Sequence, residues 1–229
     1  RKSSHIITIS NFVKNDLIKF TGVNPEKITV TLESADELPK GNEPVDELIG
    51  KKFIMYIGRP TPHKNLRRLI DAFALLQKKY PDLTLALAGK KDSNYARHET
   101  YVNEHRIKNV VFTGFISDEQ LRWMYENTAV YCFPSLSEGF GLPGLEAMLH
   151  GAPVASSTAT CLPETHGDAA RYFDPFSVED IAKSIDDILS DDKLRNELVT
   201  KGKKHVKTFS WQRMAEQTLA VYEKYGRKS

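Results

Sequence analysis

From about residue 52 onward, the chain alternates short apolar runs rich in β-branched residues with longer segments of helical period. The apolar runs predict strands at residues 53–57, 83–87, 110–112, 129–133 and 153–156. The segments between them predict helices at residues 65–79, 93–105, 118–125 and 143–150. Strands that alternate with helices pair in parallel, and the helices cover both faces of the sheet. We therefore expect an α/β protein with a Rossmann-like parallel sheet.

The two ends of the chain have a different character. The beginning predicts a strand at residues 6–9, a helix from Ser10 or Asn11 to about Phe20, and an extended run at residues 28–32. After residue 172 the pattern predicts helices at 178–190, 193–209 and 211–225. Residues 33–50 contain prolines, a glycine and acidic side chains with little periodicity, which is typical of a linker. We therefore divide the chain into a first unit (1–32), a linker (33–50), a sheet domain (51–209) and a terminal helix (210–229).

Composition excludes several classes of function. The formal charge of +2 comes from 32 basic and 30 acidic residues that are scattered along the chain, which argues against a nucleic-acid partner. Cys132 and Cys161 form neither a disulfide framework nor a zinc spacing, so we expect a reducing, cytoplasmic location and no bound metal. No apolar run is long enough to span a bilayer. The sequence begins without Met, and we expect it to be part of a longer protein.

Two loops of the predicted sheet carry chemistry. The first is the turn at residues 58–65, which follows a strand and contains Arg59 and Lys64. The second is the glycine-rich loop at residues 137–146, which also follows a strand. Because ligands bind outside the carboxyl ends of the strands in such sheets, we expect both loops to line one site. The fork of Arg59 and the point charge of Lys64 suit phosphate groups.

The glycine-rich loop adds two carboxylates, Glu138 and Glu146, on either side of Gly139, Gly141 and Gly144. Free N–H groups at the start of the following helix attract anions, and we expect the glycines to let a ligand approach the backbone closely. Carboxylates accept hydrogen bonds from neighbouring sugar hydroxyls. The loop therefore predicts a phosphorylated, hydroxyl-rich ligand such as a nucleotide diphosphate sugar.

Residues 139–144 also match the G-x-G-x-x-G pattern of dinucleotide-binding proteins. That pattern should follow the first strand, and an acidic residue should close the next strand; here the next strand ends in Ser156, Ser157 and Thr158. A nicotinamide site is therefore excluded. Taken singly, Arg59, Lys64 and Glu138 are ordinary loop charges and Glu146 is a helix-dipole partner. Their combination with the glycines favours a ligand site.

With these motifs the sequence resembles the C-terminal, donor-binding half of a retaining GT-B glycosyltransferase of the glycogen-synthase-like superfamily. The resemblance rests on the 58–65 turn, on residues 85–89, 111–115 and 134–141, and on Glu138 and Glu146 as a paired-glutamate motif. Residues 6–10 resemble the last strand and helix of the family's N-terminal acceptor domain, and the segment from Trp211 resembles its returning helix. Residues 31–36 replace the Asn-Gly linker turn of many relatives.

The resemblance implies a role for each site residue. Arg59 and Lys64 would grip the diphosphate and neutralise the leaving group, and Glu138 would face the transferred sugar; these three are the expected catalytic residues. The backbone N–H groups of the loop would hold sugar and phosphates, Glu146 would bind the ribose, and the nucleobase would lie between Gly89 and Phe115. The expected donor-binding residues are Gly58, Gly89, Phe115, Ile116, Gly139, Phe140, Gly141, Leu142 and Glu146.

The implied reaction transfers a hexose with retention of configuration to a glycan or a lipid-linked acceptor, without metal or cofactor. The donor would be GDP-mannose or a UDP-sugar, because residues 58–65 and 166–170 resemble bacterial mannosyltransferases that build surface polysaccharide. We expect this chain to bind the donor but not to transfer, since the acceptor groups belong to the N-terminal domain that is missing here. The basic run at 201–207 is a solvated helix face or a peripheral contact with the inner face of the membrane.

Alternatives remain open at this point. A non-catalytic nucleotide-sugar-binding or scaffold module, a phosphorylase and an epimerase all share the same fold class. His63 and His166 are expected in solvated loops without a catalytic role. The first strand lacks its sheet neighbours, so we expect it to be mobile, packed on the helix that begins at Trp211, or paired with another chain.

Overall fold

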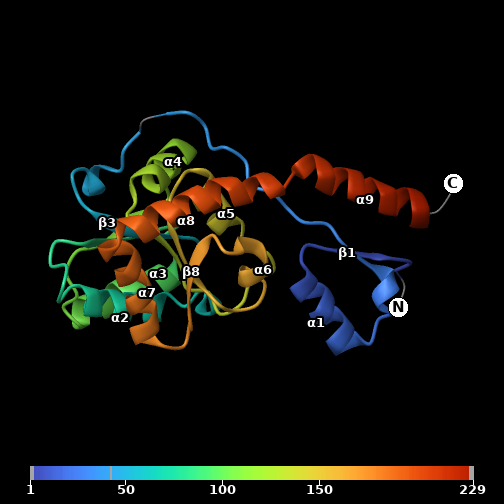
Figure 1. Cartoon of the computed structure of the whole chain (residues 1–229). Helices are drawn as coiled ribbons and strands as arrows, with labels where there is room; N and C mark the ends of the chain where they lie inside the picture. Colours follow the sequence, from blue (N-terminus) through green and yellow to red (C-terminus); the bar gives the residue numbers. More distant parts are fainter. Residues whose placement is uncertain (1–2, 42, 227–229) are drawn as a thin grey trace.

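The strands form two separate parallel sheets in the computed structural model, which describes residues 3–41 and 43–226 (Figure 1). The first sheet pairs β1 with β2, and the second has six strands in the order β5-β4-β3-β6-β7-β8. The strands are β1 (Ile6–Thr8), β2 (Ile28–Val30), β3 (Phe53–Ile57), β4 (Thr84–Ala88), β5 (Val110–Gly114), β6 (Val130–Phe133), β7 (Val154–Ser157) and β8 (Ala170–Phe173). The predicted fold class is confirmed.

The order of the six strands reverses at the centre of the sheet. From β3 the chain moves outward through β4 to β5, and it then returns to place β6 on the other side of β3. Ile54 lies opposite Val130 across this central pair. In open α/β sheets the carboxyl ends of the strands at such a reversal leave a crevice that binds ligands. The loops that follow β3 and β6 are the two loops singled out by sequence.

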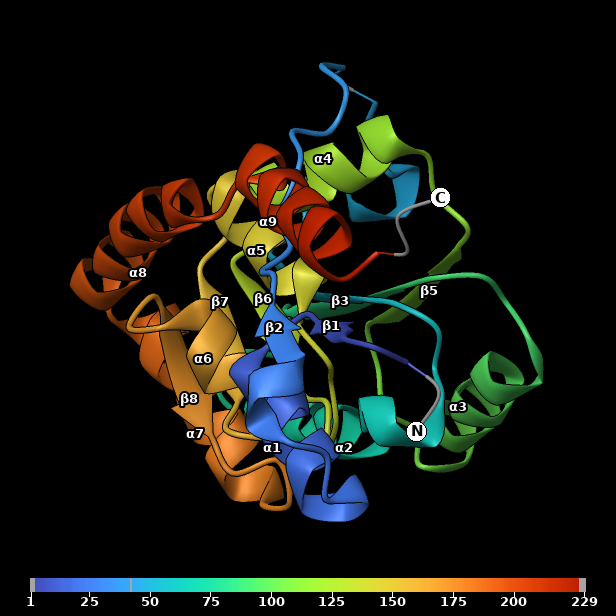
Figure 2. The same cartoon turned by 90° about the vertical axis from the view of Figure 1, so that its right-hand side faces the viewer.

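Helices cover both faces of the larger sheet (Figure 2). They are α2 (Leu66–Leu76), α3 (Ser93–Glu104), α4 (Asp118–Asn127), α5 (Leu142–Leu149), α6 (Leu162–His166), α7 (Val178–Ser190) and α8 (Asp192–His205). Within β3, Ile54 and Tyr56 pack toward α2 and α7, whereas Phe53 and Met55 pack toward α4 and α5. Burial on both faces is why β3 reads as one continuous apolar run.

Three details differ from the sequence-based expectation. Strand β8 was not predicted, because on this edge strand Arg171 is exposed and Tyr172 is only partly buried, so that no apolar run results. Helix α6 was not predicted, because it has only five residues. The expected helix at 193–209 ends at His205 and continues as a 3-10 turn, η4 (Val206–Thr208).

The segment at 33–50 connects the two sheets and packs against the larger one. It contains the 3-10 turn η2 (Asp46–Leu48), and both Val45 and Leu48 are buried in the core. Arg122 on α4 donates a hydrogen bond to the carbonyl oxygen of Leu38 at 2.9 Å. This segment is therefore fixed to the sheet unit at both Leu38 and residues 45–48.

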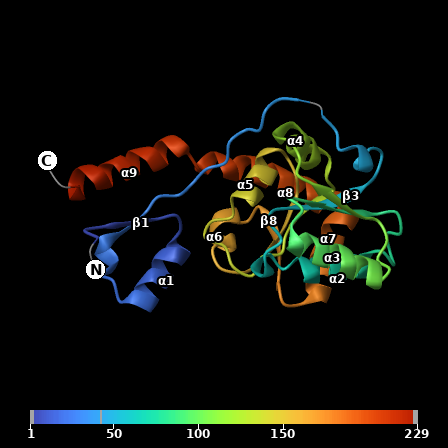
Figure 3. The ribbon, with the colours of Figure 1, turned by 180° about the vertical axis from the view of Figure 1, so that it is seen from behind.

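The first unit consists of β1, α1 (Asn11–Thr21), the 3-10 turn η1 (Pro25–Lys27) and β2. The last helix, α9 (Trp211–Tyr225), runs from the large unit toward it, as Figures 1 and 3 show. The ring of His5 stacks on Tyr225 with 4.0 Å between centroids, and the Ser4 hydroxyl donates to the Tyr225 carbonyl at 3.3 Å. We expected the first strand to be mobile, packed on this helix, or paired with another chain, and packing on the helix is confirmed. Strand β2 is also the neighbour of β1 in the small sheet.

Candidate nucleotide-sugar site

The loops after β3 and β6 are joined to each other at the centre of the sheet. The loop after β3 contains the 3-10 turn η3 (Pro62–Lys64), whose His63 carbonyl accepts a hydrogen bond from the N–H of Leu136 at 2.7 Å. The amide of Asn65, a buried residue with a φ of 60°, donates to Pro134 at 3.0 Å and to Pro175 at 2.8 Å. The expectation that both loops line one edge is therefore met by direct contacts.

Lys64 and Glu138 form an ion pair between these loops. Nζ of Lys64 lies 2.6 Å from Oε1 of Glu138, and their side chains are 21% and 13% exposed. The N–H of Glu138 donates to the Thr160 hydroxyl at 3.0 Å. Two of the three expected catalytic residues are thus brought together, and Thr160 holds the backbone of one of them.

Arg59 lies at the mouth of the site. Its side chain is 76% exposed, and its Nε donates to Asp92 at 3.3 Å. Asp92 also caps α3 by accepting from the N–H groups of Asn94 and Tyr95. Desolvation acts to raise the pKa of Asp92, but these two hydrogen bonds and the guanidinium lower it overall. An exposed guanidinium held by one contact is free to turn toward an incoming anion.

A cavity of about 560 Å³ opens beside Arg59, a volume that suits a nucleoside. Phe115, which is 85% exposed, forms part of its wall. The lining residues are Ile57, Gly58, Arg59, Gly89, Lys90, Asp92, Phe115, Ile116, Asp118 and Leu121. The structure therefore brings together Gly58, Arg59, Gly89, Phe115 and Ile116, as the sequence predicted.

The floor of this cavity needs glycine at two positions. A Cβ atom on Gly89 would lie 2.4 Å from the Gly58 carbonyl oxygen and 2.8 Å from the Tyr95 hydroxyl. Gly89 also has a φ of 148°, and Gly58 has a φ of 145°. At the ends of β3 and β4, the backbones of Gly58 and Gly89 therefore lie too close together for a side chain on Gly89.

The loop before α5 offers unpaired backbone donors. Gly141, with a φ of 101°, precedes the first turn of α5. Within residues 3–41 and 43–226, the N–H groups of Phe140, Gly141 and Leu142 donate no hydrogen bond to protein atoms. Free N–H groups at a helix start form an anion-binding site. The aromatic ring of Phe140 is buried and packs edge-on against Phe209.

The loop glycines have a second role that the sequence did not indicate. Their missing side chains make room for protein and not only for a ligand. A Cβ on Gly139 would lie 3.1 Å from Ile9, one on Gly141 would lie 2.7 Å from Leu162, and one on Gly144 would lie 2.1 Å from His166. Because these glycines lack side chains, residues of the first unit and of α6 pack directly against the loop.

Glu146 lies on α5, outside the lining of the large cavity. Its Oε2 accepts a hydrogen bond from the Tyr125 hydroxyl at 3.3 Å. Burial raises the pKa of Glu146, and the nearby carboxylates of Asp118 and Asp36 act in the same direction. Asp118, one of the charges that act on Glu146, also lines the large cavity.

The two histidines differ in their surroundings. His63 is exposed, with Nε2 3.4 Å from the Thr61 hydroxyl. His166 does not lie in a solvated loop as expected, because it ends α6 and is fully buried. Its Nε2 lies 3.3 Å from the Gly141 carbonyl oxygen and its Nδ1 lies 3.1 Å from the Ser156 hydroxyl.

The first unit touches the glycine-rich loop directly. The Ser10 hydroxyl donates to the Gly139 carbonyl at 2.7 Å. The carboxylate of Glu164 on α6 accepts from the N–H and the side-chain amide of Asn11, both at 2.8 Å, and from the N–H of Phe12 at 3.0 Å. Sequence reasoning named Ser10 only as a possible helix start, and it missed Glu164 and Asp92; of these two, Asp92 carried a signal, as a capping residue before Ser93.

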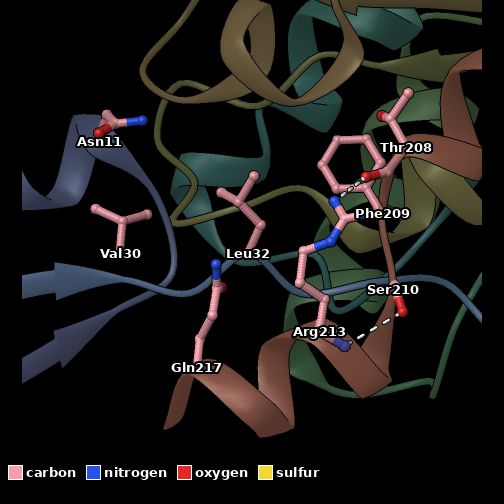
Figure 4. A pocket seen from close by; sticks show the side chains of 8 residues that line it. All are labelled: Asn11, Val30, Leu32, Thr208, Phe209, Ser210, Arg213 and Gln217. Carbon is pink, nitrogen blue, oxygen red and sulfur yellow. Dashed lines mark hydrogen bonds between the residues drawn. The ribbon is translucent and has the colours of Figure 1, made fainter. Parts of the chain in front are cut away.

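A second cavity, of about 250 Å³, lies where the chain crosses back to the first unit (Figure 4). Arg213 and Gln217 on α9 form one side, and Val30 at the end of β2 and Leu32 just after it form the other. Arg213 donates to the Thr208 carbonyl at 2.9 Å. This cavity shares no lining residue with the larger one and marks the junction between the two units.

The basic run at 201–207 lies on α8 and η4. Lys201 is paired with Glu197 at 2.8 Å and with Asp168 at 3.3 Å. Among the described residues, no helix is both long and apolar enough to cross a membrane.

Comparisons with known proteins agree with this geometry. Residues 41–205 match the family described as Glycosyl transferases group 1. The chain is 32% identical over 233 residues to O-antigen chain mannosyltransferase B of Escherichia coli, covering 95% of this chain and 60% of that protein. It is also 32% identical over 229 residues to the MMP alpha-(1->4)-mannosyltransferase of Mycolicibacterium hassiacum, covering 98% of this chain and 55% of that protein. The chain thus spans little more than half the length of these relatives.

Solved structures share the fold. Sucrose-phosphate synthase from Thermosynechococcus elongatus superposes with a TM-score of 0.80 at 25% identity, covering 95% of this chain and 57% of that one. Anabaena HepE, in a complex with UDP and glucose, superposes with a TM-score of 0.80 at 19% identity, covering 96% of this chain and 63% of that one. The GT-B fold expected from the motifs is confirmed.

Proposed function

The chain belongs to the family of group 1 glycosyl transferases, and on this basis we propose that it binds the nucleotide-sugar donor of a retaining hexosyltransferase. The observation that carries the proposal is the continuity of the site. A nucleoside-sized cavity, an exposed guanidinium, a partly buried lysine and unpaired N–H groups follow one another along the carboxyl edge of β4, β3 and β6.

In the proposed arrangement, the base enters the cavity between Gly89 and Phe115. The diphosphate then reaches Arg59 and Lys64, and the sugar lies against Glu138 and the N–H groups at the start of α5. The positive charge of two side chains and a helix start stabilises the negative charge that grows on the leaving diphosphate. These groups supply that charge without a metal ion. Glu146 would bind the ribose hydroxyls.

We propose mannose as the first candidate for the transferred hexose, since both relatives with 32% identity are named as mannosyltransferases. A glycan or a lipid-linked acceptor would bind outside this chain. We further propose that residues 51–209 form the donor-binding domain, while residues 1–32 and 210–229 associate with an acceptor-binding part. Transfer would require both parts, because closure over the donor excludes water.

Calorimetric titration tests donor binding. The chain is titrated with GDP, UDP, ADP and their hexose derivatives, and with the matching nucleosides. We expect saturable heat with at least one nucleoside diphosphate and weaker binding of its nucleoside, because the nucleoside lacks the phosphate contacts. Absence of heat with every ligand contradicts the proposal. Transfer of a labelled hexose by the full-length enzyme then separates a transferase from a non-catalytic binding module.

A further inference from the structure

The glycine-rich loop rests on a buried imidazole that no proposed contact with the donor involves. His166 is completely buried beneath the loop, at the end of α6. Its Nε2 lies 3.3 Å from the carbonyl oxygen of Gly141, and its Nδ1 lies 3.1 Å from the hydroxyl of Ser156. A carbonyl oxygen only accepts, so Nε2 carries the proton and Nδ1 accepts from Ser156.

The loop is shaped around this ring. A Cβ on Gly144 would lie 2.1 Å from Nε2 of His166, and a Cβ on Gly141 would lie 3.4 Å from the same atom. The ring also packs at a tilt against Phe133, with 5.6 Å between centroids. Two loop glycines and the end of β6 therefore form the pocket that holds the imidazole, which leaves the ring little freedom to move.

The hydrogen bond acts at the residue that begins α5. Gly141 has a φ of 101°, a conformation that favours glycine, and its carbonyl also accepts from the N–H of Gly144 at 3.0 Å. Fixing this carbonyl fixes the direction of the Leu142 N–H, which belongs to the same planar peptide group and makes no hydrogen bond within the described residues. The N–H of Gly141 lies in the preceding peptide group and is also without a partner there. Preorganised donors bind an anion without paying to reorient.

We propose that His166 is a positioning residue for the donor: its hydrogen bond to Gly141 holds the loop so that the N–H groups at the start of α5 face the sugar and phosphates. The inference rests on the proposed function for the identity of the ligand. The position of the loop itself does not depend on it. His166 touches no part of the donor, and its effect is confined to the diphosphate and sugar, because the nucleoside cavity is lined by other loops.

The test uses three variants of the whole chain. His166→Gln keeps an amide donor at the reach of Nε2, His166→Leu fills the pocket without a donor, and His166→Asn carries an amide too short to reach Gly141. His205→Leu is the matched control, because His205 donates to the Thr165 carbonyl at 2.8 Å, which lies outside the loop. Affinities for a nucleoside diphosphate and for its nucleoside are measured by calorimetry. Amide hydrogen exchange of Gly144, whose N–H donates to the Gly141 carbonyl at 3.0 Å, is measured without ligand.

We expect His166→Leu and His166→Asn to lower the diphosphate affinity by about tenfold, the loss of one good hydrogen bond, while the nucleoside affinity is unchanged. The exchange rate of the Gly144 amide should rise in both variants. His166→Gln should restore both the diphosphate affinity and the slow exchange. The proposal is overturned if the affinities for nucleoside and diphosphate fall equally, or if the diphosphate affinity falls in neither His166→Leu nor His166→Asn. If His166→Leu fails to fold, the comparison of His166→Gln with His166→Asn decides. Should the unaltered chain bind no nucleotide, the proposed function fails, and unchanged exchange of the Gly144 amide would separately overturn the role of His166.

Discussion

The ammonium group of Lys64 lies 2.6 Å from Oε1 of Glu138, which ties the loop after β3 to the loop after β6. Both groups are largely buried, so each would be costly to leave without a partner. A diphosphate that binds between the two loops would share Lys64 with Glu138. The ion pair therefore holds in place, without any ligand, the charge that we propose to bind the diphosphate.

Lys64→Ala should weaken binding of a nucleoside diphosphate. The loss should be about 1.5–3 kcal/mol, the usual worth of a hydrogen bond to a charged group. Calorimetry measures it. Lys78→Ala, at an exposed position just after the end of α2, serves as the control and should bind as the unaltered chain does. Equal affinities of the Lys64 variant and the control would remove Lys64 from the site.

Gly89→Ala should destabilise the protein and narrow the nucleoside cavity, since the new Cβ would lie 2.4 Å from the Gly58 carbonyl oxygen. Gly50→Ala is a matched control, because Gly50 has a φ of 72° but no atom within 4 Å of the position that a Cβ would occupy. Backbone strain alone costs about 1–3 kcal/mol, so the control should lose that amount and Gly89→Ala distinctly more. Thermal denaturation compares them. Equal losses would show that strain, and not the close approach, requires glycine at residue 89.

Glu146→Gln should raise stability at neutral pH and weaken nucleotide binding. Burial raises the pKa of Glu146 above its ordinary value of 4.5, so the folded state disfavours the carboxylate. The free energy of unfolding therefore falls as the pH rises above 4.5 and the carboxyl loses its proton, first in the unfolded chain. An uncharged glutamine avoids this loss of stability. The gain should vanish below pH 4.5, where the carboxyl is protonated in both states. Chemical denaturation at pH 7 and pH 4 measures it, and the exposed Glu104→Gln should show no such gain.

Acid should weaken the fold in part through His166. Burial lowers the pKa of this imidazole from 6.5 to about 4. The unfolded chain takes up the proton first, so stability is lost as pH falls from 6.5 through the folded value, by about 3 kcal/mol at about 1.4 kcal/mol per pKa unit. His166→Gln should lose less stability between pH 7 and pH 4.5 than the unaltered chain. His105→Gln, at an exposed site, should lose as much stability over this pH range as the unaltered chain. Identical losses in the two variants would show that His166 does not contribute to the acid sensitivity.

Glu164→Gln should loosen α1 without disturbing the larger sheet. The carboxylate accepts from Asn11 and Phe12 at the start of α1, where a negative charge also interacts favourably with the helix dipole. Removing that charge should speed amide exchange in α1 while exchange in β3 and β4 stays slow. Glu104→Gln is the control. Unaltered exchange in α1 would show that Ile9 and Ser10 suffice to hold the first unit.

The fold could be predicted wherever both faces of a strand are buried. The run at residues 53–57 coincides with β3, because the first four residues of that strand are buried and pack into the core on both faces. The edge strand β8 escaped because Arg171 faces solvent and the pattern resembles an ordinary loop. Patterns of apolar residues report burial, and they do not mark an element that is half exposed or only one turn long.

The sequence predicted the charged residues of the site, but it did not predict the contacts that hold its loops in position. Arg59 and Lys64 follow a strand, which places them at the ligand edge whatever the packing. By contrast, the contact between Asn11 and Glu164 joins residues 153 positions apart, and no local pattern indicates it. A glycine in a sequence also does not tell which of its sides is crowded, which is why His166 beneath Gly144 was missed.

The hydrogen bonds from α1 to Glu164 have a consequence for exchanging parts between related enzymes. Two of the three donors are main-chain N–H groups, which every residue except proline provides. The joint therefore recognises the start of a helix and not a particular side chain. A first unit from a distant relative could be grafted before residue 33 and still dock, provided that its helix begins at the position of Asn11 without proline.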